Sequence, residues 1–102
     1  MAKDRAELQT LLEGILGSRQ VYFRAPENVK MKYPAIVYTR SGLNAVYADD
    51  AKYLLHKKYT VTLIYRDPDS DLPEKILALP LCSFDRHYVA ENLNHDVFTI
   101  YF

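Results

Sequence analysis

The stretch KKYTVTLIYR, residues 57–66, decides the fold of this chain. Positions 59, 61, 63 and 65 carry Tyr, Val, Leu and Tyr, whereas positions 58, 60 and 62 are polar and Ile64 breaks the alternation. A period of two is typical of a β-strand, and a single apolar face indicates an antiparallel sheet that is covered on that side. The rest of the chain is therefore expected to extend this sheet and to cover one of its faces.

A leucine-rich segment near the start of the sequence supplies a cover. Its apolar residues recur at the three- and four-residue spacing of an amphipathic helix: Leu8, Leu11, Leu12, Ile15 and Leu16. Asp4 with Glu7 can form a capping box, and Gly17 can adopt the left-handed C-cap conformation. This helix is expected to lay its leucine stripe on the sheet.

Further strands are predicted over residues 21–23, 35–40, 81–89 and 96–102, with the polar residues 91–94 joining the last two. A second, shorter helix is predicted over residues 72–79, capped by Asp71 and Glu74 and ended by Pro80. The resulting order is α-β-β-β-α-β-β in one domain. We therefore predict an α+β fold with a mixed, mostly antiparallel sheet and two helices on one face.

Two segments without a sustained period are predicted to be loops. Residues 25–34 contain two prolines, and residues 41–55 contain Gly42, Asn44 and the pair Asp49-Asp50, although part of the second segment can extend the flanking strands. Loops longer than about 12–15 residues are uncommon in compact domains and are usually functional or disordered.

Composition narrows the function classes. Thirteen Lys and Arg offset thirteen Asp and Glu, and no basic block marks a nucleic-acid or membrane-surface binder. No apolar run approaches the roughly 20 residues of a membrane span, and no signal-peptide core follows Met1. Cys82 is the single cysteine, so an internal disulfide is excluded and synthesis in a reducing compartment is expected.

The aromatic residues suggest assembly. Nine tyrosines and four phenylalanines occur without tryptophan. Tyrosine suits surfaces that are buried only on assembly, although it also simply favours strands. The last predicted strand is apolar on both faces, because positions 97, 99 and 101 oppose Phe98, Ile100 and Phe102. We expect the helices to cover one face and a neighbouring subunit to cover the other.

The sequence provides little support for a catalytic or metal site. Ser83, Asp85 and His87 alternate along one strand and are expected on one face, but a two-residue step of about 6.6–7 Å is too long for a Ser–His hydrogen bond. His56, His87 and His95 do not show metal-ligand spacing. We expect no catalytic residue, no metal and no cofactor.

An acidic run imitates the opening of a calcium loop. Asp67, Asp69 and Asp71 match its first ligands, but Leu72 replaces the required glycine and Ala78 replaces the bidentate glutamate. We interpret the run as a turn followed by a helix cap.

Several of these segments together resemble the small tail-terminator and tail-completion proteins of long-tailed bacteriophages. The resemblance rests on the leading leucine-stripe helix, the strand Tyr33-Pro34-Ala35-Ile36-Val37-Tyr38 and the closing β-α-β-β order. Residues 65–71, 82–86 and 94–98 look especially like neck or tail proteins of phages and prophages of Gram-positive bacteria. The likeness covers nearly the whole chain, residues 1–102, as one tail-terminator-like domain.

The resemblance implies a structural role in the virion. Proteins of this family form hexameric rings that cap the tail tube, end its polymerisation and meet the head connector or stopper protein, while DNA only passes through the lumen. They are not enzymes and carry no cofactor. Long loops at a ring's rim or lumen suit partner contacts. The candidate contact residues are Arg24, Lys30 and Lys32 in the first loop and Arg40, Tyr47, Asp49, Asp50, Lys52 and Tyr53 at the second.

Three alternatives remain open from the sequence. The chain can belong to another neck ring, such as a head-completion or stopper protein. It can be a small hydrolase that uses Asp85 and His87. It can also be a nucleic-acid-binding module that stacks bases on a tyrosine-rich sheet.

Overall fold

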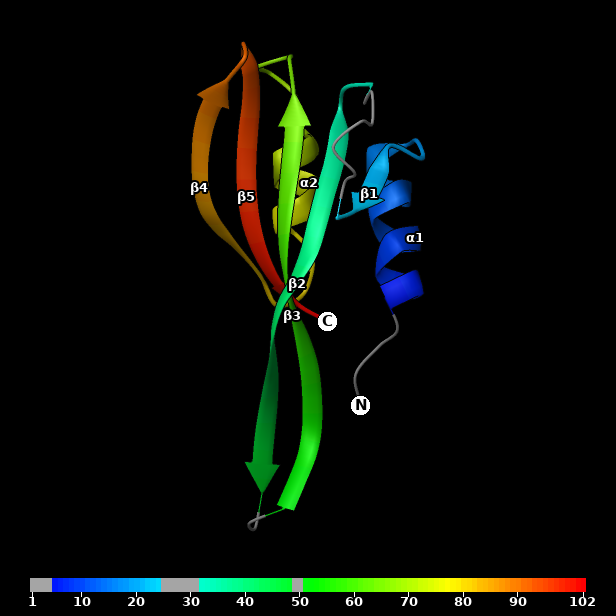
Figure 1. Cartoon of the computed structure of the whole chain (residues 1–102), viewed down its shortest axis with the longest axis vertical. Helices are drawn as coiled ribbons and strands as arrows, with labels where there is room; N and C mark the ends of the chain where they lie inside the picture. Colours follow the sequence, from blue (N-terminus) through cyan, green and yellow to red (C-terminus); the bar gives the residue numbers. More distant parts are fainter. Residues whose placement is uncertain (1–4, 25–31, 49–50) are drawn as a thin grey trace.

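The computed structural model describes residues 5–24, 32–48 and 51–102, with side chains for residues 5–24, 32–42 and 57–102. Its elements are α1 (Arg5–Leu16), β1 (Val21–Phe23), β2 (Ala35–Ala48), β3 (Ala51–Tyr65), α2 (Leu72–Leu77), β4 (Cys82–Ala90) and β5 (Leu93–Tyr101) (Figure 1). This is the predicted α-β-β-β-α-β-β order, and the α+β prediction is confirmed.

The strands form one five-stranded sheet in the order β1-β2-β3-β5-β4. β1 runs parallel to β2, and every other neighbouring pair is antiparallel, so the sheet is mixed and mostly antiparallel as predicted. β3 is the central strand and contains the stretch KKYTVTLIY. The alternation in that stretch therefore marks the middle strand of the five.

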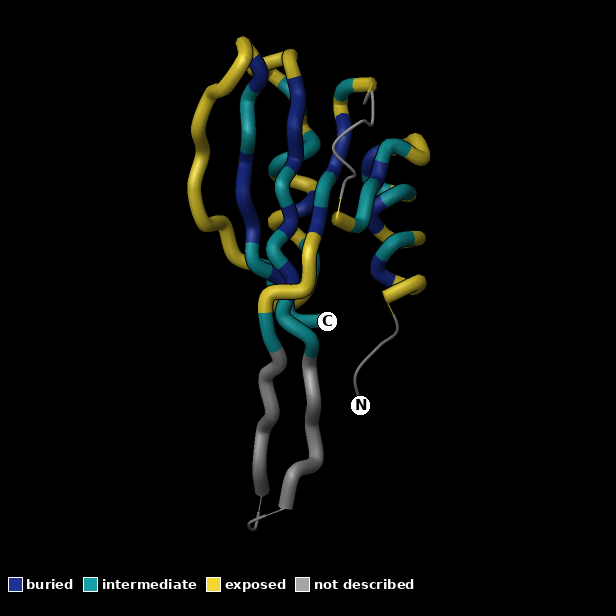
Figure 2. The backbone as a smooth tube through the Cα atoms, viewed as in Figure 1, coloured by how far each residue is buried: buried dark blue, intermediate teal, exposed yellow. Residues whose placement is uncertain are grey.

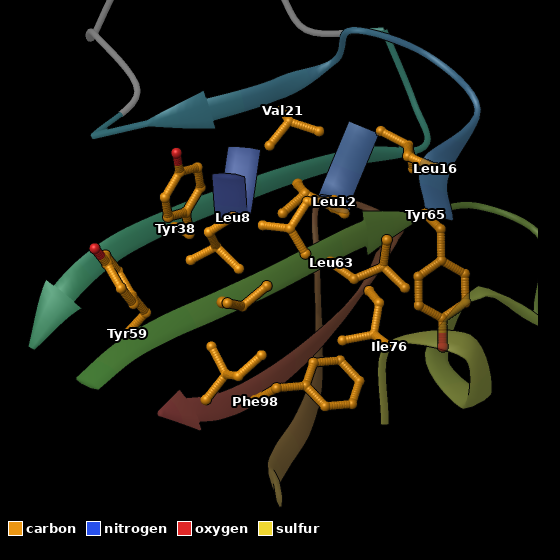
Figure 3. Packing of buried hydrophobic residues seen from close by; sticks show 13 residues of the cluster. Leu8, Leu12, Leu16, Val21, Tyr38, Tyr59, Leu63, Tyr65, Ile76 and Phe98 are labelled. Carbon is orange, nitrogen blue, oxygen red and sulfur yellow. The ribbon is translucent and has the colours of Figure 1, made fainter. Parts of the chain in front are cut away.

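The core lies between the two helices and one face of the sheet (Figure 3). Leu8, Leu12 and Leu16 of α1 and Ile76 of α2 pack against apolar residues of the strands. Those strand residues are Val21, Ile36, Tyr38, Tyr59, Val61, Leu63, Tyr65, Phe98 and Ile100. The leucine stripe is confirmed at the three buried positions, whereas Leu11 stays 37% exposed.

Residues with positive φ end α1 and form the turn of the β4–β5 hairpin. Gly17 has a φ of +78° and donates its N–H to the carbonyl of Glu13, which is the predicted left-handed C-cap. Glu91 and Asn92 have φ values of 53° and 62°, as a two-residue type I′ turn requires. The predicted connection over residues 91–94 is therefore too long, because Leu93 pairs with Ala90 and begins β5.

The predicted loop over residues 41–55 is wrong for residues 41–48 and 51–55, which continue β2 and β3. β2 and β3 stay paired from Gly42–Lys58 to Ala48–Ala51 and form a two-stranded arm that extends beyond the sheet (Figure 1). We call residues 43–48 and 51–56 the arm and the remainder of the described chain the body. The register shifts between Arg40 and Gly42 and again between Val46 and Tyr47. Each shift places an extra residue in one strand of the pair, which interrupts the period of two in the sequence.

One face of the sheet is turned away from the helices. Val97 of β5 lies on this face, yet it is only 3% exposed within the single chain. This residue therefore needs no neighbouring subunit to cover it. The apolar surface that stays open lies on β4 instead, which is exposed along almost its whole length (Figure 2).

Candidate functional site at the root of the arm

The structure brings together two of the predicted contact residues, Arg24 and Arg40. They line one cleft with Arg5, Phe23, Lys57 and Tyr59, at the place where the arm leaves the body. Lys32 is exposed and lies outside this lining. The backbones of Tyr47, Lys52 and Tyr53 belong to the arm, and their side chains are outside the described residues, as are Lys30, Asp49 and Asp50 altogether.

Four elements position the cleft residues. β1 ends at Phe23, which pairs in parallel with Tyr38, and the next residue, Arg24, donates its backbone N–H to the Tyr38 carbonyl at 3.1 Å. Arg40 pairs with Tyr59 across β2 and β3, just before the first register shift. Arg5 is the first residue of α1. The short parallel strand thus stops where the cleft opens, and the helix begins beside it.

An aromatic ring holds two of the cations in place. The Cζ atoms of Arg5 and Arg24 lie 4.5 Å and 5.1 Å from the centroid of the Phe23 ring. Phe23 in turn packs on Tyr38, with 5.2 Å between ring centroids. Arg5 also donates a hydrogen bond to the Tyr38 hydroxyl at 3.3 Å. These contacts orient both guanidinium groups at the cleft before any ligand arrives.

The electrostatics of the cleft favour an anion. Among the residues that the structure describes, its lining contains Arg5, Arg24, Arg40 and Lys57 and no carboxylate. In the described ranges the ion pairs are Lys75–Asp71 and His87–Asp96, so no described acid neutralises these four cations. Guanidinium groups bind carboxylate and phosphate oxygens through two parallel N–H donors. The cleft is therefore built to receive carboxylates or phosphates.

Sequence reasoning missed Arg5 and Lys57. Arg5 lies 19 positions before Arg24, and Lys57 lies 17 positions after Arg40, so no local motif connects the four cations. The β1–β2 and β2–β3 pairings bring Arg24, Arg40 and Lys57 to one place, and α1 adds Arg5 through its contacts with Phe23 and Tyr38.

A second polar cluster surrounds Asp96, the buried charged residue of the described core, which is 4% exposed. The Tyr65 hydroxyl donates to its Oδ2 atom at 2.7 Å, and Nδ1 of His87 hydrogen-bonds its Oδ1 atom. Three effects raise the pKa of Tyr65 to about 12. The largest is burial, followed by the hydrogen bond to Asp96 and then the negative charge of Asp96. Both carboxylate oxygens are thus occupied, as a buried carboxylate requires.

The predicted common face of Ser83, Asp85 and His87 is wrong. A register shift between Phe84 and Arg86 pairs Ser83 with Thr99 but His87 with Asp96. Residues 96 and 99 lie on opposite faces of β5, so Ser83 and His87 do as well. The carboxylate partner of His87 is Asp96, and within the described residues no hydroxyl or thiol hydrogen-bonds this histidine.

The free edge of the sheet at β4 carries a third feature. β4 pairs with β5 on one side, and apolar side chains are exposed on β4, at Leu81 just before it and at the end of α2. They are Leu77, Leu81, Phe84, Tyr88 and Val89, with exposed fractions from 41% to 63%. We call these five residues and the β4 backbone the β4 edge.

No protein-family model, curated protein or solved structure matches this chain.

The described ranges contain neither a cluster of metal ligands nor a membrane-spanning helix. No three His, Cys, Asp or Glu side chains there gather closely enough to share a metal ion. No described helix combines the length and apolar character needed to cross a membrane.

Cys82 is half-buried, and burial raises the pKa of its thiol, which keeps it in the less reactive protonated form.

Proposed function

We propose that this protein is a structural component of a bacteriophage tail. Its copies form a ring, expected to be hexameric, that caps the head-proximal end of the tail tube, stops tube growth and joins the tail to the head connector. The partners are further copies of the chain, the tube protein and the connector or stopper protein, and DNA passes through the lumen. The resemblance noted in the sequence suggests this role, and the β4 edge is the observation that carries it.

The β4 edge supports assembly because it combines two exposed features. The outer backbone N–H and C=O groups of an edge strand can pair with another chain. Here Val89 is 63% exposed and Leu81 is 59% exposed. The exposed apolar side chains of β4 lie on both faces of the edge strand, because Phe84 and Val89 pair with Phe98 and Asn94 on one face and Tyr88 pairs with His95 on the other. A strand added to this edge would contact both faces. A ring of identical copies would cover this edge through a head-to-tail contact.

The arm supports contact with a second partner. Its strands extend six residues beyond Gly42 on one side, which is roughly 20 Å of extended chain. In the described residues β3 pairs with β5 as far as Lys58, so beyond that point the arm strands pair with each other. An isolated two-stranded hairpin is marginally stable in water, so a neighbouring subunit or the tube is needed to stabilise the arm.

The role is non-enzymatic and virion-associated in this proposal. The alternative closest to it is another ring of the neck, such as a head-completion or stopper protein, which would use the same β4 edge and arm. The two roles differ in what the ring does to a growing tube, and that difference provides the functional test.

The test combines mass measurement with tube assembly. Sedimentation across a protein concentration series should reveal a closed oligomer, and adding the protein to polymerising tail-tube protein should give shorter, capped tubes in negative stain. Val89→Ser should weaken self-association, because it places a hydroxyl at the most exposed apolar side chain of the β4 edge, and Leu11→Ser, on the outer side of α1, is the matched control. A protein that stays monomeric both in solution and on tubes, or tubes that lengthen unchecked beside rings, would contradict termination.

A further inference from the structure

We infer that the basic cleft of one copy receives the acidic turn of a second copy, residues 67–71, as the polar part of the ring contact. This inference rests on the proposed ring and assigns a partner to the cleft formed by Arg5, Arg24, Arg40 and Lys57. The partner chemistry is a pair of carboxylates presented on a short, ordered protein turn.

The acidic turn is ordered and leaves carboxylates available. Oδ1 of Asp67 accepts the backbone N–H of Asp69 at 3.0 Å, and the Asp67 carbonyl accepts the N–H of Ser70 at 3.1 Å. Asp71 forms an ion pair with Lys75 at 3.3 Å. Asp67 and Asp69 are exposed and form no ion pair with any described residue. The two carboxylates therefore project from a turn whose backbone is already fixed.

The cleft and the acidic turn of the same copy cannot meet. Lys57 stands where β3 enters the sheet, and the acidic turn follows Tyr65 at the other end of the same strand. Eight residues of extended strand separate Lys57 from Tyr65, which is roughly 26 Å. A contact between these surfaces must therefore join two copies. Because it joins two different patches, it is heterologous and can close a ring.

Charge favours a protein partner over a nucleic acid. The chain is neutral overall, with 13 cationic and 13 acidic residues. Four cations gather in one cleft, two of them fixed on a single phenyl ring, whereas duplex DNA needs cations spread along several phosphates. A neutral chain that concentrates cations at one place and carboxylates at another is complementary to itself.

A charge-swap experiment on the full chain tests the inference. Arg40→Glu and Asp69→Lys are exposed substitutions whose side chains form no hydrogen bond or ion pair with described residues. Each alone is expected to weaken self-association by about tenfold or more, because like charges then face each other across the contact. An equal mixture of the two variants should restore assembly to within about threefold of the wild type, since alternating copies present opposite charges at every contact.

Arg19→Glu makes the same change of charge outside the cleft and is the matched control. Variants that assemble like the wild type, or a mixture that fails to restore assembly, would overturn the inference while leaving the ring intact. Binding of a 20-base-pair DNA duplex at low salt separates the other possibility. If Arg40→Glu abolishes duplex binding and leaves assembly unchanged, the cleft takes phosphate and not the acidic turn. A wild-type chain that never assembles would instead remove the proposed ring itself.

Discussion

The body and the arm contain the same two strands in opposite surroundings. In the body, β2 and β3 lie between β1 and β5, and the helices cover one face, with Tyr38 and Leu63 fully buried. In the arm, the same strands pair with each other alone among the described residues. The comparison shows that the two parts have different sources of stability. The body is held by its own core, whereas the arm continues a pairing that the body starts.

The largest expected effect is a loss of stability of the body. Leu12 is 0% exposed and packs between α1 and the sheet, so Leu12→Ala leaves a cavity in the core. The free energy of unfolding is expected to fall by about 3 kcal/mol. Urea denaturation followed by circular dichroism measures the change.

Leu11→Ala is the matched control on the same helix. Leu11 is 37% exposed, so its truncation is expected to cost less than about 1 kcal/mol. Equal losses in the two variants would show that the helix is not packed through its Leu8, Leu12 and Leu16 face.

A smaller effect concerns the polar cluster inside the body. The folded state raises the pKa of Tyr65 to about 12, above the ordinary value of 10.0. The contribution of the neutral phenol is therefore fully present below pH 10 and is lost as the pH rises through 12. Tyr65→Phe is expected to cost about 1 kcal/mol at pH 7 through the lost hydrogen bond to Asp96, and to reduce the fall in stability between pH 10 and 12. Thermal unfolding across that pH range measures both, and an unchanged alkaline fall in the variant would contradict the assignment.

The smallest expected effect on stability comes from removing the arm. Residues 44–56 can be replaced by Asn-Gly, because Leu43 and Lys57 are direct partners and Asn-Gly favours the two-residue type I′ turn. The body is expected to keep its free energy of unfolding within about 1 kcal/mol, since a two-stranded hairpin adds little by itself. Urea denaturation at a concentration where the protein is monomeric measures this. A body that unfolds without the arm would show that the two parts form one cooperative unit.

The sequence alone determined the elements that the core needs. The period of two in residues 57–65 and the period of about 3.6 in residues 8–16 identified the central strand and the covering helix. Burial repeats along a strand or a helix with a fixed period, so a local pattern is sufficient evidence for these elements. It also predicted the order of the elements and the fold class, and it singled out Arg24 and Arg40.

Only the tertiary structure decided the arm, the cleft and the Asp96 cluster. Register shifts near Gly42 and Val46 interrupt the pairing of the arm strands, and another near Asp85 places Ser83 and His87 on opposite faces, so the local period fails there. The cleft joins Lys57 to Arg24 and Arg40 through strand pairings between distant segments, and the packing of α1 adds Arg5. Such proximity is set by cross-strand register, which depends on the whole sheet and is not encoded in the spacing of residues along the chain.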